Sequence, residues 1–321
     1  MQPNIQMDVL QRKNADKYRK KWDLKIIYEQ RYLFLMSVPF LIWLIIFKYV
    51  PLWGWSMAFQ NYKPARSFFE QEWVGFKHFI DLFREPQFYL VMRNTLSMSF
   101  LGLVFGFTAP ILFAILLNEI RNIPFKRTIQ TVSYLPHFVS WVIAGSLILK
   151  MLSVDGVLND ILLALGIITQ PVQFMAMPKA FWFIATFAEI WKEMGWNSII
   201  YLAAITGIDT ELYEAAKVDG AGRFRQIWHI TLPGIRSTII VILIMSIGWL
   251  INIGFEKQFI LGNPLVNDYA EVLDLYVLNY GVRLGRYSYG TAIGIFKSVV
   301  SIALLLFANQ FAKKIGEGRI L

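Results

Sequence analysis

Residues 214–233 read EAAKVDGAGRFRQIWHITLP, the most polar long segment between two very hydrophobic ones. Just upstream, Asp209 or Thr210 can cap the start of a helix, while Gly220 and Gly222 are stop signals at its end. The pattern predicts a helix of about ten residues, a length that is marginal in water for an isolated helix. We therefore expect this helix to dock on a partner surface.

A second short helix is predicted after the glycines. Leu232 and Pro233 should end it, because the residue before a proline avoids the α region. Basic residues occupy much of the remaining helical wheel, which indicates an amphipathic helix lying along the membrane surface. The residues of its membrane-facing stripe recur at helical spacing, namely Phe224, Ile227, Trp228 and Thr231.

Composition indicates a polytopic membrane protein. Of 321 residues, 56% are hydrophobic, against about 45–50% in soluble domains. There are no cysteines, which excludes disulfides, thiolate nucleophiles and cysteine metal sites. The sequence also contains no P-loop, no HExxH metal motif and no GxSxG nucleophile motif. The chain is therefore not expected to be an enzyme, and no metal site is expected in it.

Hydropathy divides the chain into six predicted membrane spans joined by polar segments. The apolar stretch within residues 152–179 is too short to span and is expected to form a helix on the outer face. The predicted regions are a basic tail at 1–31, a first span with its outer interface at 32–60, an extracytoplasmic segment at 61–94, a five-helix core at 95–312 and a second tail at 313–321. The spans themselves are placed at about 32–50, 96–117, 131–151, 180–205, 237–259 and 291–312.

The distribution of basic residues predicts which side faces the cytoplasm. The net charge of +9 could point to nucleic acid in a soluble protein, but in a membrane protein it follows from the positive-inside rule. With the N-terminus inside, the cytoplasmic segments hold eighteen Lys and Arg residues and the outer segments hold eight. Both termini and the loop at 206–236 are therefore expected in the cytoplasm, and no nucleic-acid partner is expected.

The polar loop resembles a family signature. Its residues fit the EAA signature of the permease subunits of bacterial ABC importers, and the stretch GWNSIIYLAAITGID at 195–209 resembles permeases for oligosaccharides. The resemblance covers nearly the whole chain. It implies an all-α membrane protein with six transmembrane helices, the type I permease fold of ABC importers, and a cytoplasmic coupling helix that sits in a cleft of an ATPase subunit. The matching coupling residues are Glu214, Ala215, Ala216, Asp219, Gly220, Ile230, Leu232 and Pro233.

The fourth span contains charges that should not face lipid, because a charge at the bilayer centre costs about 2.5–3.5 kcal/mol. Glu189 and Lys192 can pair on one helix face, and Lys297 of the sixth span is a second candidate partner for Glu189. Two interpretations remain open: the cluster lines the substrate path, with Trp191 and Trp196 as platforms for sugar rings, or it is a buried ion network against a partner permease. The path candidates are Glu189, Trp191, Lys192, Glu193, Trp196, Asn197 and Lys297.

Three smaller features carry their own predictions. Gly102 and Gly106 form a small-residue face that should pack against another helix. Glu256 and Lys257 should form a pair at the outer interface. The segment 262–290 should be a structured outer loop with tyrosines at the interface.

Together these patterns predict the transmembrane subunit of an ATP-driven importer. It would move a carbohydrate, by resemblance an oligosaccharide, from an extracytoplasmic binding protein into the cytoplasm by alternating access. The expected partners are a second permease, two ATPase subunits that hold ATP and magnesium, the binding protein, and the lipid of the bacterial inner membrane; no cofactor is expected in this chain. Two other classes remain open, namely an ion-coupled secondary transporter that uses the charges of the fourth span, and an ABC permease for a non-sugar solute.

Overall fold

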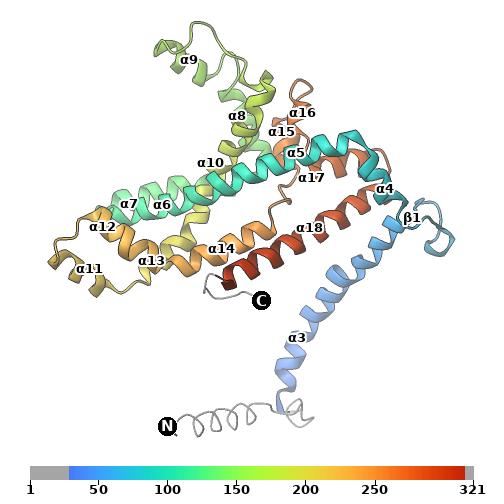
Figure 1. Ribbon diagram of the computed structural model, residues 1–321, viewed down its shortest axis with the longest axis horizontal. Coiled ribbons are helices and arrows are strands. Elements are labelled where there is room, and N and C mark those ends of the chain that lie inside the picture. The colour runs from blue at the N-terminus through green and yellow to red at the C-terminus, as the bar shows by residue number, and fades with distance from the viewer. Residues whose placement is uncertain (1–28, 315–321) are drawn as a thin grey trace. The chain divides into compact units, whose positions relative to one another are not determined.

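The structure is a computed structural model that describes residues 29–314 of the chain (Figure 1). It divides into two compact units, whose described parts are residues 29–56 and 57–314. The two predicted basic tails therefore lie almost entirely outside the described residues. The described part is helical, as predicted, apart from loops and one pair of two-residue strands.

The first predicted span is one long helical run. Helix α3 (Arg31–Leu44) continues through a π-helical turn (Ile45–Tyr49) into a 3-10 helix (Val50–Phe59). Pro39 lies inside α3, where it removes one backbone hydrogen bond without ending the helix. The whole run of 29 residues is long and apolar enough to span a membrane.

The second unit begins with a small hairpin. Strand β1 (Gln60–Asn61) pairs antiparallel with β2 (Glu72–Trp73), and a 3-10 turn (Phe68–Glu70) lies between them. Buried Gln71 holds this loop closed, because its amide donates to and accepts from the backbone of Lys63 at 3.0 and 2.8 Å. Helix α4 follows at Lys77–Arg84.

The second predicted span is continuous and longer than expected. Helix α5 (Pro86–Leu101) passes through a π-helical turn (Gly102–Gly106) into α6 (Phe107–Glu119). This run of 34 residues is the longest apolar helix of the described chain. π-Helical turns inside longer helices frequently mark functional sites, and this one lies opposite the middle of α10 in the cavity described below.

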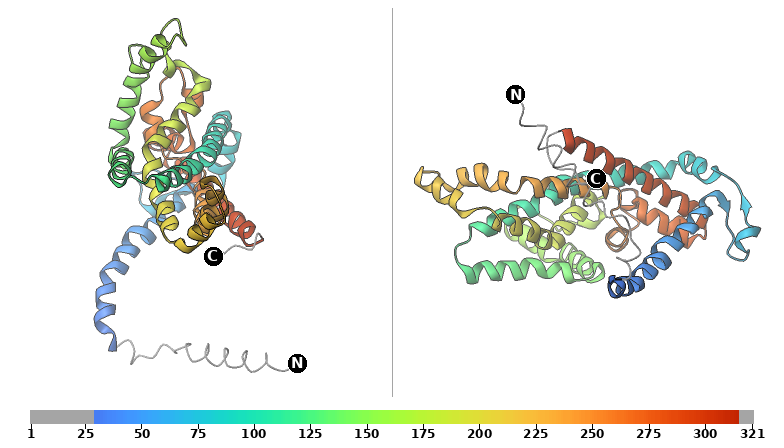
Figure 2. Two further views of the ribbon diagram at one scale, coloured as in Figure 1. Left: turned by 90° about the vertical axis from the view of Figure 1, so that its left-hand side faces the viewer. Right: turned by 90° about the horizontal axis from the view of Figure 1, so that it is seen from below.

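The third predicted span is not one helix. Helix α7 (Ile123–Tyr134) and a 3-10 turn (Leu135–Phe138) are followed by α8 (Trp141–Met151), and the two halves are bent by 107°. Pro136 lies in the turn and has no backbone N–H to donate. After the bend, α8 is followed by α9 (Val157–Ala164), the short helix predicted between the third and fourth spans (Figures 1 and 2).

Helix α10 (Phe181–Thr206) corresponds to the predicted fourth span and contributes to two core clusters. Phe181 near its start packs with Leu261, and Ile205 near its end packs with Ile115 of α6. By length and composition, three described helices can span a membrane, or five if each of two bent pairs is one span. α10 is absent from that count because three charges lie near its middle; with it, the number reaches the six that were predicted.

The fifth predicted span is broken, so the expected continuous helix at 237–259 was wrong. Helix α14 (Arg236–Gly248) ends mid-way, and α15 (Glu256–Leu261) begins after an unwound segment at 249–255, which we call the link. Gly254 within the link has φ +79°, a left-handed conformation that interrupts a helix and suits glycine. The sequence around the break is mostly apolar, so hydropathy alone predicts one continuous span there.

The chain between the fifth and sixth spans folds back into the protein. It forms α16 (Asn267–Ala270), α17 (Leu273–Tyr276) and a π-helical turn (Val277–Arg283) before α18 (Tyr287–Lys314), the sixth span. The segment is structured, as predicted, but not all of its tyrosines are interfacial. Tyr276 and Tyr289 are buried, and their hydroxyl groups hydrogen-bond each other at 3.0 Å.

Candidate functional site

The polar loop folds largely as its sequence predicts. Helix α11 (Thr210–Val218) is nine residues long, and the Asp209 side chain caps it by accepting a hydrogen bond from the Glu211 amide at 2.9 Å. Gly220 follows with φ +75°, the left-handed conformation that ends the helix. Tyr213 fixes α11 to the second half of the loop, since its hydroxyl lies 3.0 Å from the hydroxyl of buried Thr231.

The second half of the loop differs from the prediction in one respect. Helix α12 (Arg223–Gln226), a π-helical turn (Ile227–Thr231) and α13 (Leu232–Gly234) form one short helical run. The run ends at Gly234, one residue beyond the predicted end, although Leu232 before the proline keeps α-helical φ and ψ of −62° and −46°. The wide π-helical turn precedes it, Pro233 occupies the first turn of α13, where a missing N–H is tolerated, and the chain bends by 61° into α14.

The loop exposes large apolar side chains that nothing in the described chain covers. Val218 and Phe224 are each 89% exposed and Trp228 is 70% exposed. The predicted stripe is split, because Phe224 and Trp228 face outward while Thr231 is buried. Of the predicted coupling residues, the exposed ones are Glu214, Ala215, Asp219, Gly220 and Pro233, and the partly buried ones are Ala216, Ile230 and Leu232.

A cavity of about 340 Å³, which we call the central cavity, lies between three elements of the second unit: α10, the α5–α6 run, and α14 with the link. Its wall on α10 repeats every three or four residues, as one face of a helix does. The polar groups of this wall are Thr186, Glu189, Glu193, Asn197 and Tyr201. The other polar or aromatic lining groups include Ser99, Phe107, Ser246, Trp249 and Asn252.

Two glycines of the α5–α6 run open onto this cavity. A Cβ atom added to Gly102 or Gly106 would meet no atom within 4 Å. The prediction that this small-residue face packs against another helix was therefore wrong. The absent side chains instead leave open space next to α10.

The carboxylate of Glu189 forms an ion pair across the cavity edge with Lys257 of α15. The Lys257 side chain is 5% exposed and that of Glu189 is 46% exposed, so the ammonium is buried behind a carboxylate that the cavity reaches. The predicted pairing of Glu189 with Lys192 or Lys297 was wrong, as was the interfacial pair of Glu256 and Lys257. Because the fifth span is broken, α15 places Lys257 inside the protein.

Glu193 anchors a second charged group one turn further along α10. Its carboxylate lies 3.0 Å from the Lys192 ammonium and 2.7 Å from Nδ1 of His137. The Lys192 ammonium also donates to the backbone carbonyl of His137 at 2.8 Å. The two buried ammonium groups, of Lys192 and Lys257, both lie over the ring of Trp141, at 5.7 and 5.9 Å from its centre. The charges of this region are thus paired, and the two ammonium groups share the Trp141 ring as a further contact.

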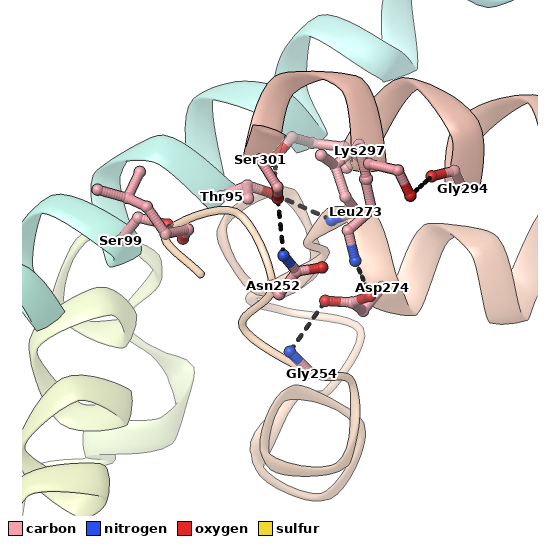
Figure 3. A network of polar contacts seen from close by, with 12 residues as sticks. Thr95, Ser99, Asn252, Gly254, Leu273, Asp274, Gly294, Lys297 and Ser301 are labelled. Atoms are coloured by element: carbon pink, nitrogen blue, oxygen red, sulfur yellow. Dashed lines mark hydrogen bonds and ion pairs between the residues drawn. The ribbon is translucent and has the colours of Figure 1, made fainter. Parts of the chain in front are cut away.

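The remaining path candidates lie elsewhere. Lys297 of α18 pairs with Asp274 of α17, next to the link (Figure 3). Trp196 stacks on the His137 ring with centroids 4.4 Å apart, and Trp191 lines a separate apolar groove between α8 and α10. Of the seven candidates, the structure therefore brings three to the central cavity, namely Glu189, Glu193 and Asn197.

Sequence reasoning missed several lining groups. Trp249 and Asn252 reach the cavity because the span unwinds at the link, and Phe107 reaches it from the start of α6. One sequence signal could have marked the break. Asn252 is a polar residue that lies between Gly248 and Gly254 in an otherwise apolar span.

Interrupted helices around a cavity that contains polar groups, together with a loop of short exposed helices, are typical of a polytopic membrane permease. The chain belongs to the family described as the binding-protein-dependent transport system inner membrane component, which its residues 102–317 match. Members of this family are membrane components of transport systems. The family decides against the ion-coupled secondary transporter considered from the sequence, and it assigns the chain a transport role rather than an enzymatic one.

Two relatives from Bacillus subtilis (strain 168) cover almost the whole chain. The polygalacturonan/rhamnogalacturonan transport system permease protein YteP is 48% identical over 93% of this chain and 92% of its own length. Protein LplB is 47% identical over 89% of this chain and 90% of its own. A solved bacterial ABC transporter involved in the import of the acidic polysaccharide alginate contains a chain of the same fold, with a TM-score of 0.84 and 40% identity over 92% of this chain and 99% of that one.

Proposed function

We propose that this chain passes oligosaccharides from an extracytoplasmic binding protein to the cytoplasm as the permease subunit of an ATP-driven importer. The observation that carries the proposal is the exposed helix α11 with its EAA residues, in a chain of this transport family. The sugar substrate is supported by the relatives, of which YteP is named for polygalacturonan and rhamnogalacturonan and the solved neighbour for alginate. That neighbour has also been solved with a periplasmic protein that holds an alginate pentasaccharide.

We assign the exposed loop to docking of the ATPase. An uncovered apolar surface on a polar loop is typical of an interaction site. Ala215 is small and exposed, so a partner backbone can approach α11 closely there, and neighbouring Glu214 offers a polar anchor. Transport is coupled only if the ATPase binds α11 differently in its two states, because a contact that is equal in both shifts no equilibrium.

We assign the central cavity to the sugar path. Its volume of about 340 Å³ is near the lower end for ligand pockets, so it fits a segment of an oligosaccharide rather than a long chain. The carboxylates of Glu189 and Glu193 can accept hydrogen bonds from sugar hydroxyl groups, and Trp249, which is 69% exposed, offers an aromatic face. In this assignment Trp249 takes the stacking role that the sequence suggested for Trp191 and Trp196.

The remaining parts of the proposal are the topology, which rests on the distribution of basic residues, and the partner subunits, which rest on the family. The excess of Lys and Arg in these segments supports a cytoplasmic position for both termini and the α11 loop. The partners would be a second permease, two ATPase subunits that bind ATP and magnesium, and the binding protein, all at the bacterial inner membrane. A second permease would cover the half of the path that this chain leaves open.

The test is to purify the chain from its native membrane in mild detergent and to identify the proteins that accompany it. We expect a P-loop ATPase and a second permease with an EAA loop. Vesicles of the purified complex, supplied with the binding protein, should then take up labelled digests of polygalacturonan or alginate in an ATP-dependent way. Uptake of phosphate or peptides instead would refute the sugar assignment, and purification without an ATPase would refute the coupling assignment.

A further inference from the structure

The link that breaks the fifth span is held at three points, each on a different helix (Figure 3). The Leu250 carbonyl accepts a hydrogen bond from the Ser99 hydroxyl of α5. The Asn252 amide donates to the Ser301 hydroxyl of α18 at 2.9 Å. The Gly254 backbone N–H donates to Oδ2 of Asp274 in α17 at 2.9 Å. Unwound backbone inside a membrane protein is tolerated where such partners satisfy it or where it lines a cavity, and this link meets both conditions.

Asp274 has two partners, one for each carboxylate oxygen. Oδ2 accepts from the Gly254 backbone, and Oδ1 binds the Lys297 ammonium of α18. Lys297 is 8% exposed, so its charge requires the Asp274 carboxylate. The carboxylate thus contacts both the buried ammonium and the turn of the link at which Gly254 adopts φ +79°.

The residues just before this anchor form one wall of the central cavity. Trp249, Leu250, Asn252 and Ile253 line it, whereas Asp274 and Lys297 do not. A change in the turn at Gly254 moves these wall groups, because they lie one to five residues before it on the same unwound segment. A residue that does not touch the cavity thus sets the shape of one of its walls.

We propose that Asp274 is a positioning residue for transport: it holds the cavity-lining link in place through the Gly254 amide, while its other carboxylate oxygen neutralises the buried Lys297 ammonium. The inference rests on the assignment of the central cavity to the substrate path. It separates two roles of one side chain, since the hydrogen bond to the link positions the wall and the ion pair only neutralises a buried charge.

Two double variants separate these roles. Lys297→Met with Asp274→Asn removes both charges but leaves an amide oxygen that can accept from the Gly254 N–H. Lys297→Met with Asp274→Leu removes both charges and the acceptor, with a side chain of similar size. The two proteins differ in whether position 274 can accept the hydrogen bond from the link, and both avoid an unpaired buried charge.

The chain has no cysteines, so a single introduced thiol reports its own position. Ile253→Cys places the thiol on the link, and Ser246→Cys places a control thiol on the α14 part of the same cavity. The intact complex is treated with a small water-soluble thiol reagent, and the labelling rate of this chain is followed. We expect the rate at position 253 to differ about tenfold between the Leu and Asn double variants, the factor that 1.4 kcal/mol produces, and the rate at position 246 to agree within about twofold.

Two labelling outcomes overturn the proposal. Equal rates at position 253 in the two double variants mean that the hydrogen bond does not hold the link. A change of similar size at position 246 means that the whole cavity loosens and that Asp274 has only a structural role. Neither outcome depends on the identity of the sugar.

Uptake of a polygalacturonan digest supplies the functional readout. In the Leu double variant we expect KM to rise about tenfold with Vmax within about twofold, because the wall moves while the ATPase loop is untouched; the Asn variant should keep the parental KM. An unchanged KM in the Leu variant also overturns the proposal. If the parent complex transports no oligosaccharide while labelling behaves as expected, the sugar assignment fails and the role of Asp274 in holding the link stands.

Discussion

The ion pair between Glu189 and Lys257 should respond very differently to loss of one partner or the other. Replacing Glu189 by Leu leaves an ammonium that is 5% exposed, whereas replacing Lys257 by Met leaves a carboxylate that is 46% exposed and open to cavity water. Removal of one partner of a buried pair costs about 3–5 kcal/mol. We therefore expect about 3 kcal/mol for Glu189→Leu, and only about 1 kcal/mol for Lys257→Met because its partner remains solvated.

The double variant that combines Glu189→Leu with Lys257→Met should recover the stability that Glu189→Leu loses. With both charges gone, neither side leaves an unpaired ion, so the protein should return to within about 1 kcal/mol of the parent. The resulting coupling between the two positions is about 3–4 kcal/mol, which is large for a single pair. Such a cycle isolates the pair from any separate effect of each side chain on packing.

The assay is thermal unfolding of the purified protein in one detergent at one pH. The expected order of melting temperature is parent and double variant highest, Lys257→Met slightly lower, and Glu189→Leu several degrees lower. The control is Lys150→Met, because the Lys150–Asp155 pair is about three-quarters exposed on both sides and its loss should leave the melting temperature unchanged. A Lys257→Met protein that melts at or below Glu189→Leu refutes the reasoning from exposure.

Three further substitutions test the loop, the cavity and the packing of α10. Ala215→Trp should leave the amount of protein in the membrane unchanged but abolish ATP-dependent uptake, because the exposed face of α11 can no longer approach a partner; normal uptake would contradict this. Gly106→Leu should lower uptake at least about tenfold without lowering the melting temperature, since its side chain enters open cavity space. Gly195→Ala should destabilise the protein by about 1–3 kcal/mol, because its Cβ would overlap the Ser133 carbonyl. The matched control is Gly102→Ala, which has open space around it and should change the stability by less than about 1 kcal/mol. The melting temperatures of the two variants check this difference.

Local signals predicted the loop well because its structure is decided locally. Asp209 caps α11 and Gly220 ends it, as their residue types and positions suggest. The predicted helix end at Pro233 lies one residue from the observed end at Gly234, but the reason given for it was wrong, because Leu232 keeps α-helical angles after the π-helical turn. A sequence rule for proline describes an ordinary α-helix and does not anticipate that turn.

The cavity depends on contacts that sequence patterns do not contain. Glu189 and Lys257 are 68 residues apart, and they meet only because the fifth span unwinds before Lys257. Spacing along one helix suggested Lys192 as the partner, but Lys192 turns to Glu193 and to the His137 carbonyl. Asn252 between Gly248 and Gly254 marks the break, but the span is otherwise apolar, so hydropathy alone did not indicate it and the pairings across it were not inferred.

The two candidate sites share continuous elements of the fold. Helix α10 carries the cavity wall and ends at Thr206, three residues before Asp209 caps α11. On the other side of the loop, Gly234 of α13 approaches Ile208 so closely that a Cβ there would lie 2.6 Å from its Cδ1 atom. From α13 the chain bends into α14, which ends at the link. The loop is thus tied to the cavity through α10 and through α14.

A displacement of α11 would therefore reach two walls of the cavity at once, the α10 wall with its glutamates and the link. Linkage is reciprocal for binding free energies, so a ligand that favours one arrangement of these walls must favour the corresponding position of the loop by the same factor. If the ATPase binds the loop differently in its two states, substrate in the cavity will in turn bias the ATPase. Because Asp274 fixes the far end of the link, its two double variants should differ in how strongly substrate stimulates ATP hydrolysis, although neither substitution touches the loop.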